Sequence, residues 1–198
     1  MITRRTLLLS VPLLASARVS YAATAPLPAA YAGSKYVASE KAPSEIEIAD
    51  EKEPGERLIV SGKVATVGRS PLAGVSLYIF HADAAGHYAT KGADVDTNAR
   101  LAGALRTAKD GTFSYSTIRP GQYKGNPATI KVVVTPKVYI PQMRELWFWD
   151  DPIIEERVEK NQPEVPKSYP PGVVTIVPAI RNVQKIIRSV QNIVIEHT

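Results

Sequence analysis

Short runs of β-branched and aromatic residues alternate with turn signals along the chain from residue 57 onward. Six such runs stand out, at residues 58–66, 74–83, 111–118, 128–136, 144–150 and 172–180. Each run has the length of a β-strand, and no helix-length periodic segment separates one from the next, which argues against repeated βαβ units. The pattern therefore predicts an all-β sandwich over residues 57–198, which is the size of one domain.

Residues 23–56, before the six runs, and residues 181–198, after them, show weaker patterns. Residues 23–56 are rich in Ala, Pro, Ser and acidic residues without sustained periodicity, so we interpret them as a linker or N-terminal arm. In the tail, residues 181–198, Val183, Ile187, Val190 and Val194 recur at helical spacing. Residues 193–195 equally resemble a closing strand, so helix and strand both stay open for the tail.

Residues 1–22 have the features of an export signal. A cationic start at Arg4 and Arg5 precedes an apolar run at residues 7–15, and small residues flank a cleavage site that ends at Ala22. The adjacent arginines resemble a twin-arginine signal, and a general secretory signal is the alternative. Either signal predicts a periplasmic or secreted bacterial protein. A second apolar run of spanning length is not present, so we expect no transmembrane segment.

Charge and cysteine content narrow the function classes. The 24 Lys and Arg exceed the 19 Asp and Glu by five, but residues 1–22 contribute three arginines and no acid, so the remainder has an excess of two. This small excess, without a basic stripe, argues against a nucleic-acid partner. The chain has no Cys, which excludes disulfides, thiolate metal sites and a thiol nucleophile.

Three stretches of the chain carry a recognisable order of motifs. Residues 71–88 predict a strand that leads into a turn presenting Tyr88, and residues 107–123 predict a turn, a strand and then Tyr123 after a Pro-Gly pair. Residues 145–152 follow as an aromatic strand. In this order, over roughly residues 55–155, the sequence resembles the intradiol ring-cleavage dioxygenases, the family of catechol and protocatechuate 3,4-dioxygenases.

The resemblance implies a fold, a cofactor and a pair of ligands. The fold is an antiparallel β-sandwich of the intradiol dioxygenase type with short peripheral helices or linker segments. The cofactor of the family is a non-haem Fe(III) ion, held by two tyrosinates and two histidines, that activates a catechol-type aromatic substrate. The tyrosine positions correspond to Tyr88 and Tyr123, and phenolate oxygen is a hard donor suited to Fe(III).

The histidine positions depart from the family pattern. The family carries His-x-His after an Arg-Pro-Ala lead, whereas this chain has Thr129 and Lys131 at the two histidine positions and Asn126 at the arginine position. A protonated lysine has no lone pair to give, so we expect the iron site to be lost and no metal to be bound. If iron is bound, Tyr88 and Tyr123 are the expected ligands.

We expect a metal-free ligand pocket formed by Tyr88, Tyr123, Lys131, Thr129 and Asn126. Thr129 and Lys131 are two apart on a predicted strand and so face the same side. The hypothesis is that the Lys131 ammonium donates hydrogen bonds to both tyrosines. The alternatives are that Lys131 reaches the surface of a shallow cleft and that the tyrosines are ordinary packed aromatics.

Other candidate ligands have weaker support. His81 and His87 flank the first motif without a metal-binding partner at recognisable spacing, and His197 lies beside the C-terminus. A loop with Asp94, Asp96 and Asn98 lacks the glycine and glutamate of a calcium loop, so we expect it to be solvated. Within residues 147–149, Trp147 and Trp149 share one face and Phe148 the other, so that one face packs the core and the other covers a cleft or meets a subunit.

Three functions stay open on these observations. The favoured one is a non-catalytic protein that binds a small aromatic ligand or a partner subunit, in a homo- or hetero-oligomer. The second is an active iron dioxygenase whose missing ligands come from His81, His87, a carboxylate or another chain. The third is a metal-free enzyme in which Lys131 acts as a base or forms an imine.

Overall fold

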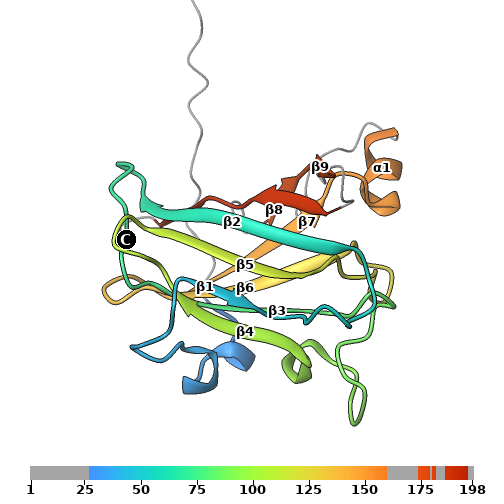
Figure 1. Cartoon of the computed structure of the whole chain (residues 1–198), viewed down its shortest axis with the longest axis horizontal. Helices are drawn as coiled ribbons and strands as arrows, with labels where there is room; N and C mark the ends of the chain where they lie inside the picture. Colours follow the sequence, from blue (N-terminus) through green and yellow to red (C-terminus); the bar gives the residue numbers. More distant parts are fainter. Residues whose placement is uncertain (1–26, 160–173, 179, 182–185, 196–198) are drawn as a thin grey trace, which may run out of the picture.

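Two β-sheets pack face to face in the computed structural model, which describes residues 27–159, 174–178, 180–181 and 186–195 (Figure 1). The first sheet has the order β1 (Glu45–Glu47), β5 (Thr112–Ile118), β2 (Arg57–Thr66), β10 (Ile187–Val190) and β9 (Ile180–Arg181), and β11 (Ile193–Ile195) also pairs with β2. The second sheet has the order β4 (Leu101–Arg106), β3 (Ser76–His81), β6 (Thr129–Thr135), β7 (Gln142–Phe148) and β8 (Val174–Val177). The predicted all-β sandwich is confirmed.

Alternation along the strands builds the main core between the sheets. Leu58 and Val60 of β2 pack against residues such as Leu77 of β3 and Ile130 and Val132 of β6, all essentially inaccessible to solvent. Burying each such side chain stabilises the fold by about 1.5–3 kcal/mol relative to leaving it exposed. Because side chains alternate across a strand, the residues between these positions face outward, where they build a second surface.

The central strand pairs are antiparallel, as the family fold implies, but both sheets are mixed. β2 pairs with β5, and β3, β4, β6 and β7 pair with their neighbours, in antiparallel fashion. β1 pairs with β5, β10 and β11 pair with β2, and β8 pairs with β7 in parallel. Parallel pairs need a long connection, which here is supplied by segments such as the one containing α1 (Pro152–Glu159).

The sequence pattern missed two strands, β1 and β4, and joined two others. β1 has only three residues and lies in the segment interpreted as a linker or arm. β4 reads Leu-Ala-Gly-Ala-Leu-Arg, and its small residues lack the β-branched signal of a strand. The predicted run at residues 172–180 contains two strands in different sheets, β8 and β9, on either side of Pro178. For the tail, the described residues form strands, since burial alternates along β10 and β11. None of the helices in the described parts of the chain is both long and apolar enough to cross a membrane.

The described part of the predicted arm, residues 27–56, packs on the sandwich. Its two 3₁₀ turns, η1 (Ala29–Tyr31) and η2 (Ser34–Tyr36), appear in blue beyond β3 and β4 in Figure 1. Their tyrosines join an outer aromatic cluster with Phe80, Val133 and Met143 on the outward face of the second sheet. Single aromatic residues anchor this segment, which explains why it shows no periodicity. The export signal predicted at residues 1–22 lies outside the described residues.

Two loops meet at the end of the second sheet because glycines allow their backbones to touch. Gly86 lies in the β3–β4 loop, residues 82–100, with a φ of +85°. A Cβ atom placed there would be 2.0 Å from the carbonyl oxygen of Gln122, in the β5–β6 loop, residues 119–128. Gly121 of the second loop donates its N–H to the carbonyl oxygen of Asp83 at 2.8 Å. This close approach brings Tyr88 and Tyr123 together.

Replacing Gly86 by alanine should therefore disrupt the contact between the loops. We expect Gly86→Ala to lower the free energy of unfolding by about 3 kcal/mol, measured by urea denaturation, from left-handed strain together with the backbone clash. Gly125→Ala is the matched control, because Gly125 also has a positive φ, of +75°, but nothing lies within 4 Å of its added Cβ. The control should lose only about 1 kcal/mol. Equal losses in the two variants would show that the interloop clash is unimportant.

Candidate functional site

The candidate site lies on the outward face of the second sheet. Thr129 and Lys131 of β6 alternate with core residues and face this side, as their spacing predicts. Across the β6–β7 ladder, Lys131 pairs in register with Glu145, and Thr129 pairs with Trp147. Directly opposed side chains in an antiparallel pair have their Cβ atoms about 5 Å apart, so the sheet places Lys131 and Glu145 side by side.

All five residues expected to form a pocket line one small cavity. We call this cavity, of about 70 Å³, the tyrosine pocket. Its lining consists of Ala82, Tyr88, Gly121, Tyr123, Asn126, Pro127, Thr129, Lys131 and Glu145. An apolar cavity of about 150 Å³ accommodates benzene, so this pocket is too small to enclose an aromatic ring. Glu145 was not among the sequence candidates, because its pairing with Lys131 depends on strand register.

The two tyrosines meet edge to face with their ring centroids 4.9 Å apart. The Tyr123 hydroxyl donates to the carbonyl oxygen of Asp94 at 2.6 Å, and the Asp94 carboxylate accepts the backbone N–H of Tyr88 at 2.7 Å. Burial raises the pKa of Tyr88 above its ordinary value of 10, and the nearby carboxylates of Asp96 and Glu145 raise it further. Tyr88 is consequently a neutral phenol at physiological pH.

Lys131 donates its hydrogen bond to an aspartate, and not to the two tyrosines as hypothesised. The Lys131 ammonium lies 2.5 Å from Oδ2 of Asp96, in the β3–β4 loop. The hydroxyl of Tyr31, from the arm, donates to the same oxygen at 2.6 Å. Lys35 of the arm also donates to the carbonyl oxygen of Thr97 at 2.7 Å. The arm thereby fixes the carboxylate that holds Lys131.

The expectation that residues 94–98 form a solvated loop is wrong for Asp96, which is partly buried. Burial acts to raise the pKa of Asp96, but the hydrogen bonds from Lys131 and Tyr31 outweigh it, and the pKa lies below its ordinary value of 3.8. Asp96 is therefore ionised. No pattern in the sequence indicated this role of Asp96, because the contacts come from residues 65 positions before it and 35 positions after it.

Glu145 is the acidic residue that lines the pocket and is only 7% exposed. Its Oε2 accepts the indole N–H of Trp147 at 3.0 Å. Burial raises the pKa of Glu145 above its ordinary value of 4.5, although the Lys131 charge opposes this rise. Trp147 thus lies next to a lining residue, whereas Phe148 packs in the main core and Trp149, just after β7, is 50% exposed.

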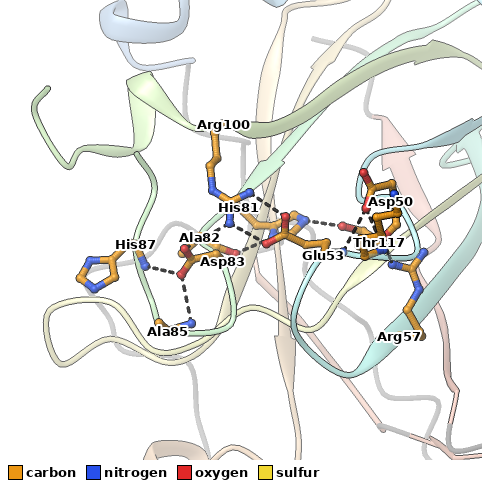
Figure 2. A network of polar contacts seen from close by, with 11 residues as sticks. Asp50, Glu53, Arg57, His81, Ala82, Asp83, Ala85, His87, Arg100 and Thr117 are labelled. Carbon is orange, nitrogen blue, oxygen red and sulfur yellow. Dashed lines mark hydrogen bonds and ion pairs between the residues drawn. The ribbon is translucent and has the colours of Figure 1, made fainter. Parts of the chain in front are cut away.

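His81 serves the scaffold and does not line the tyrosine pocket. Its ring is fully buried, with Nε2 2.7 Å from the Thr117 hydroxyl and Nδ1 2.7 Å from the carbonyl oxygen of Ala82 (Figure 2). Burial lowers its pKa from 6.5 to about 4, so the ring is neutral at physiological pH. Beside it, Arg100 makes a two-pronged contact with Glu53 at 2.8 and 2.5 Å and also reaches Asp83. This network ties the arm to the β3–β4 loop.

His87 also lies away from the pocket lining. His87 points away from the network in Figure 2, is exposed, and contacts the Asp94 carboxylate at 3.1 Å. His197 lies outside the described residues. Within the described ranges, no group of three or more His, Cys, Asp or Glu side chains is placed to hold a metal ion.

Comparison with known proteins identifies similar sequences. The family model described as Dioxygenase matches residues 30–139 of this chain. Chlorocatechol 1,2-dioxygenase of Rhodococcus opacus is 25% identical over 122 residues, covering 52% of this chain and 48% of the relative. The protocatechuate 3,4-dioxygenase beta chain of Burkholderia cepacia is 36% identical over 73 residues, covering 35% and 31%. The chain thus spans half or less of the length of these curated relatives.

Solved structures share the fold. The dioxygenase domain of a dioxygenase and carbohydrate-binding protein fusion from Streptomyces sp. SirexAA-E superposes with a TM-score of 0.60 at 24% identity, covering 82% of this chain and 94% of that one. The 3-chlorocatechol 1,2-dioxygenase of Rhodococcus opacus 1CP gives 0.59 at 21% identity, covering 79% and 68%. At these identities the likeness concerns the fold.

The buried His81 predicts a specific pH dependence of stability. Between pH 6.5 and 4 the unfolded chain binds a proton at this histidine and the folded chain does not, so the free energy of unfolding falls as the pH falls through this window. The loss amounts to about 3 kcal/mol for a shift from 6.5 to about 4. His81→Gln should show a correspondingly smaller difference in urea stability between pH 7 and pH 4. The exposed His87→Gln serves as the control, and identical slopes in wild type and His81→Gln would contradict the assignment.

The hydrogen bond from Tyr31 of the arm to Asp96 leads to a second prediction. Tyr31→Phe keeps the stacking on Phe80, whose ring centroid is 5.5 Å away, but removes the donor to Asp96. We expect the pKa of the Asp96 carboxyl, followed by ¹³C NMR, to rise towards 3.8, and the free energy of unfolding to fall by about 2 kcal/mol, as for a hydrogen bond to a charged group. Tyr36→Phe removes a hydroxyl from the same cluster without affecting this bond. If both variants moved the Asp96 titration equally, Tyr31 would be a packing residue only.

Proposed function

Because this chain belongs to the intradiol dioxygenase family, we propose that it is an exported, non-catalytic member that binds a small aromatic ligand in the tyrosine pocket. The observation that carries the proposal is the ion pair between Lys131 and Asp96. Lys131 stands at a strand position where the family resemblance implies a histidine ligand. Export is supported by the sequence of residues 1–22 alone.

The residues present do not fit the Fe(III) ion on which the family depends. Thr129 and Lys131 stand at the two histidine positions, and the Lys131 ammonium is a hydrogen-bond donor without a lone pair. The described lining of the pocket contains no imidazole, and the hydroxyl of Thr129 does not replace one as a ligand of Fe(III).

The two enzymatic alternatives have less support among the described residues, although one carboxylate, that of Glu145, does line the pocket with Tyr88 and Tyr123. His81 hydrogen-bonds to Thr117 in the interior, and His87 is exposed beside Asp94, so neither histidine replaces a missing ligand in this arrangement. Lys131, as an ammonium paired with Asp96, has no lone pair with which to attack a carbonyl group. A partner subunit is the alternative non-catalytic role, supported by one relative that is named as a beta chain.

Restoring the histidines provides the test. The mature protein, incubated with Fe(III), should bind no stoichiometric iron and show no broad visible absorption band. In Thr129→His/Lys131→His the donor set regains two imidazoles next to Tyr88 and Tyr123, so we expect bound iron, measured by metal analysis, and a tyrosinate charge-transfer band.

Lys137→His, a change of an exposed lysine, controls for adventitious binding to a new histidine. Stoichiometric iron and a visible band in the wild-type protein would overturn the non-catalytic proposal. In that case catechols become the substrates to assay. A double variant that stays iron-free would show that the two tyrosines are not placed as ligands.

A further inference from the structure

We propose that the tyrosine pocket selects a ligand with an ammonium head group, an amine, over one with a carboxylate. The inference rests on the proposed function, because it names the ligand class of that same pocket. Its basis is the balance of charge within the described site. Lys131 is the one cationic side chain that lines the pocket, and Asp96 already neutralises it at 2.5 Å.

Glu145 makes no direct ion pair with any of the described residues, because the ammonium of its neighbour Lys131 is bonded to Asp96. Glu145 lines the pocket opposite Lys131 across the β6–β7 ladder and is 7% exposed. Its Oε2 accepts a hydrogen bond from the neutral indole of Trp147, which does not compensate a negative charge. A buried carboxylate is costly unless a cation accompanies it, and the raised pKa of Glu145 reflects that cost. An entering ammonium group supplies the missing charge, and an entering carboxylate meets a like charge.

The tyrosine rings favour the same ligand class. Aromatic rings attract cations, and Tyr88 and Tyr123 both line the pocket. The ammonium of Lys124 already lies 4.8 Å from the ring centroid of Tyr123, so Tyr88 is the ring that remains for a ligand.

The volume of the tyrosine pocket limits the size of the group that can enter it. A cavity of about 70 Å³ takes an ammonium group and its adjoining carbon but not a whole aromatic ring. The ligand predicted by these dimensions carries a primary amine on a short arm, with an apolar or aromatic part resting at the mouth. Benzylamine is a suitable probe, with benzyl alcohol and benzoate as the neutral and anionic probes of similar shape.

Trp147 provides a direct readout of binding. The chain has two tryptophans, so a ¹H–¹⁵N spectrum contains two indole signals. The Trp147 N–H donates to Glu145 within the site, whereas Trp149 is 50% exposed after the end of β7 and serves as the internal reference. Benzylamine should shift the Trp147 signal saturably at pH 7, with an affinity at least tenfold higher than that of benzyl alcohol. Benzoate should leave it unchanged.

Glu145→Gln should abolish the preference for the amine, and Glu155→Gln, on the exposed side of α1, should retain it. The comparison of the three probes on wild-type protein needs no variant, so a folding defect in Glu145→Gln does not block the test. If benzyl alcohol or benzoate shifts Trp147 at least as strongly as benzylamine, the ligand class is wrong and the pocket is still a binding site. If no probe shifts Trp147, or if Trp147 and Trp149 shift together, both this inference and binding of a small aromatic ligand fail.

Discussion

One carboxylate oxygen, Oδ2 of Asp96, connects three parts of the molecule that are far apart in the sequence. It accepts a hydrogen bond from the ammonium of Lys131, in β6, and another from the hydroxyl of Tyr31, in the arm. Asp96 itself belongs to the β3–β4 loop. A partly buried ion pair gains stability only when its remaining hydrogen-bonding capacity is satisfied, and Tyr31 meets that condition. The position of Lys131, the closure of the loop and the docking of the arm consequently depend on one another.

The same interaction explains how a metal-binding scaffold retains its shape with a different donor set. In the family, a bound cation holds the anionic ligands together; here the lysine charge lies within the pocket and is covalently part of β6. Burial, and after it the carboxylates of Asp96 and Glu145, favours the neutral form of Tyr88. On the proposed interpretation, the pocket offers hydrogen bonding and charge complementarity, within a β-sandwich that the family shares.

The sequence predicted the scaffold better than the contacts of the site. Short runs of β-branched and aromatic residues between turn signals identified β2, β3, β5, β6 and β7, and the resemblance placed Tyr88, Tyr123, Thr129 and Lys131 around one pocket. Strand β4 was not predicted, because its small residues have low β propensity. The partners of Lys131 were not predicted, for a different reason. Glu145 is its neighbour through strand register, and Asp96, which also bonds Tyr31, reaches it through the docking of the loop and the arm. No periodicity along one segment encodes such contacts.

The parallel pairing of β10 and β11 with β2 has a consequence for how the chain is made. During synthesis, residues 57–66 emerge more than a hundred residues before the strands that cover that edge of β2. Until residues 187–195 arrive, one row of backbone N–H and C=O groups on a ten-residue strand is unpaired, and such edges recruit other chains. The order of synthesis therefore leaves this edge of β2 open to pairing with other chains until the C-terminal strands cover it.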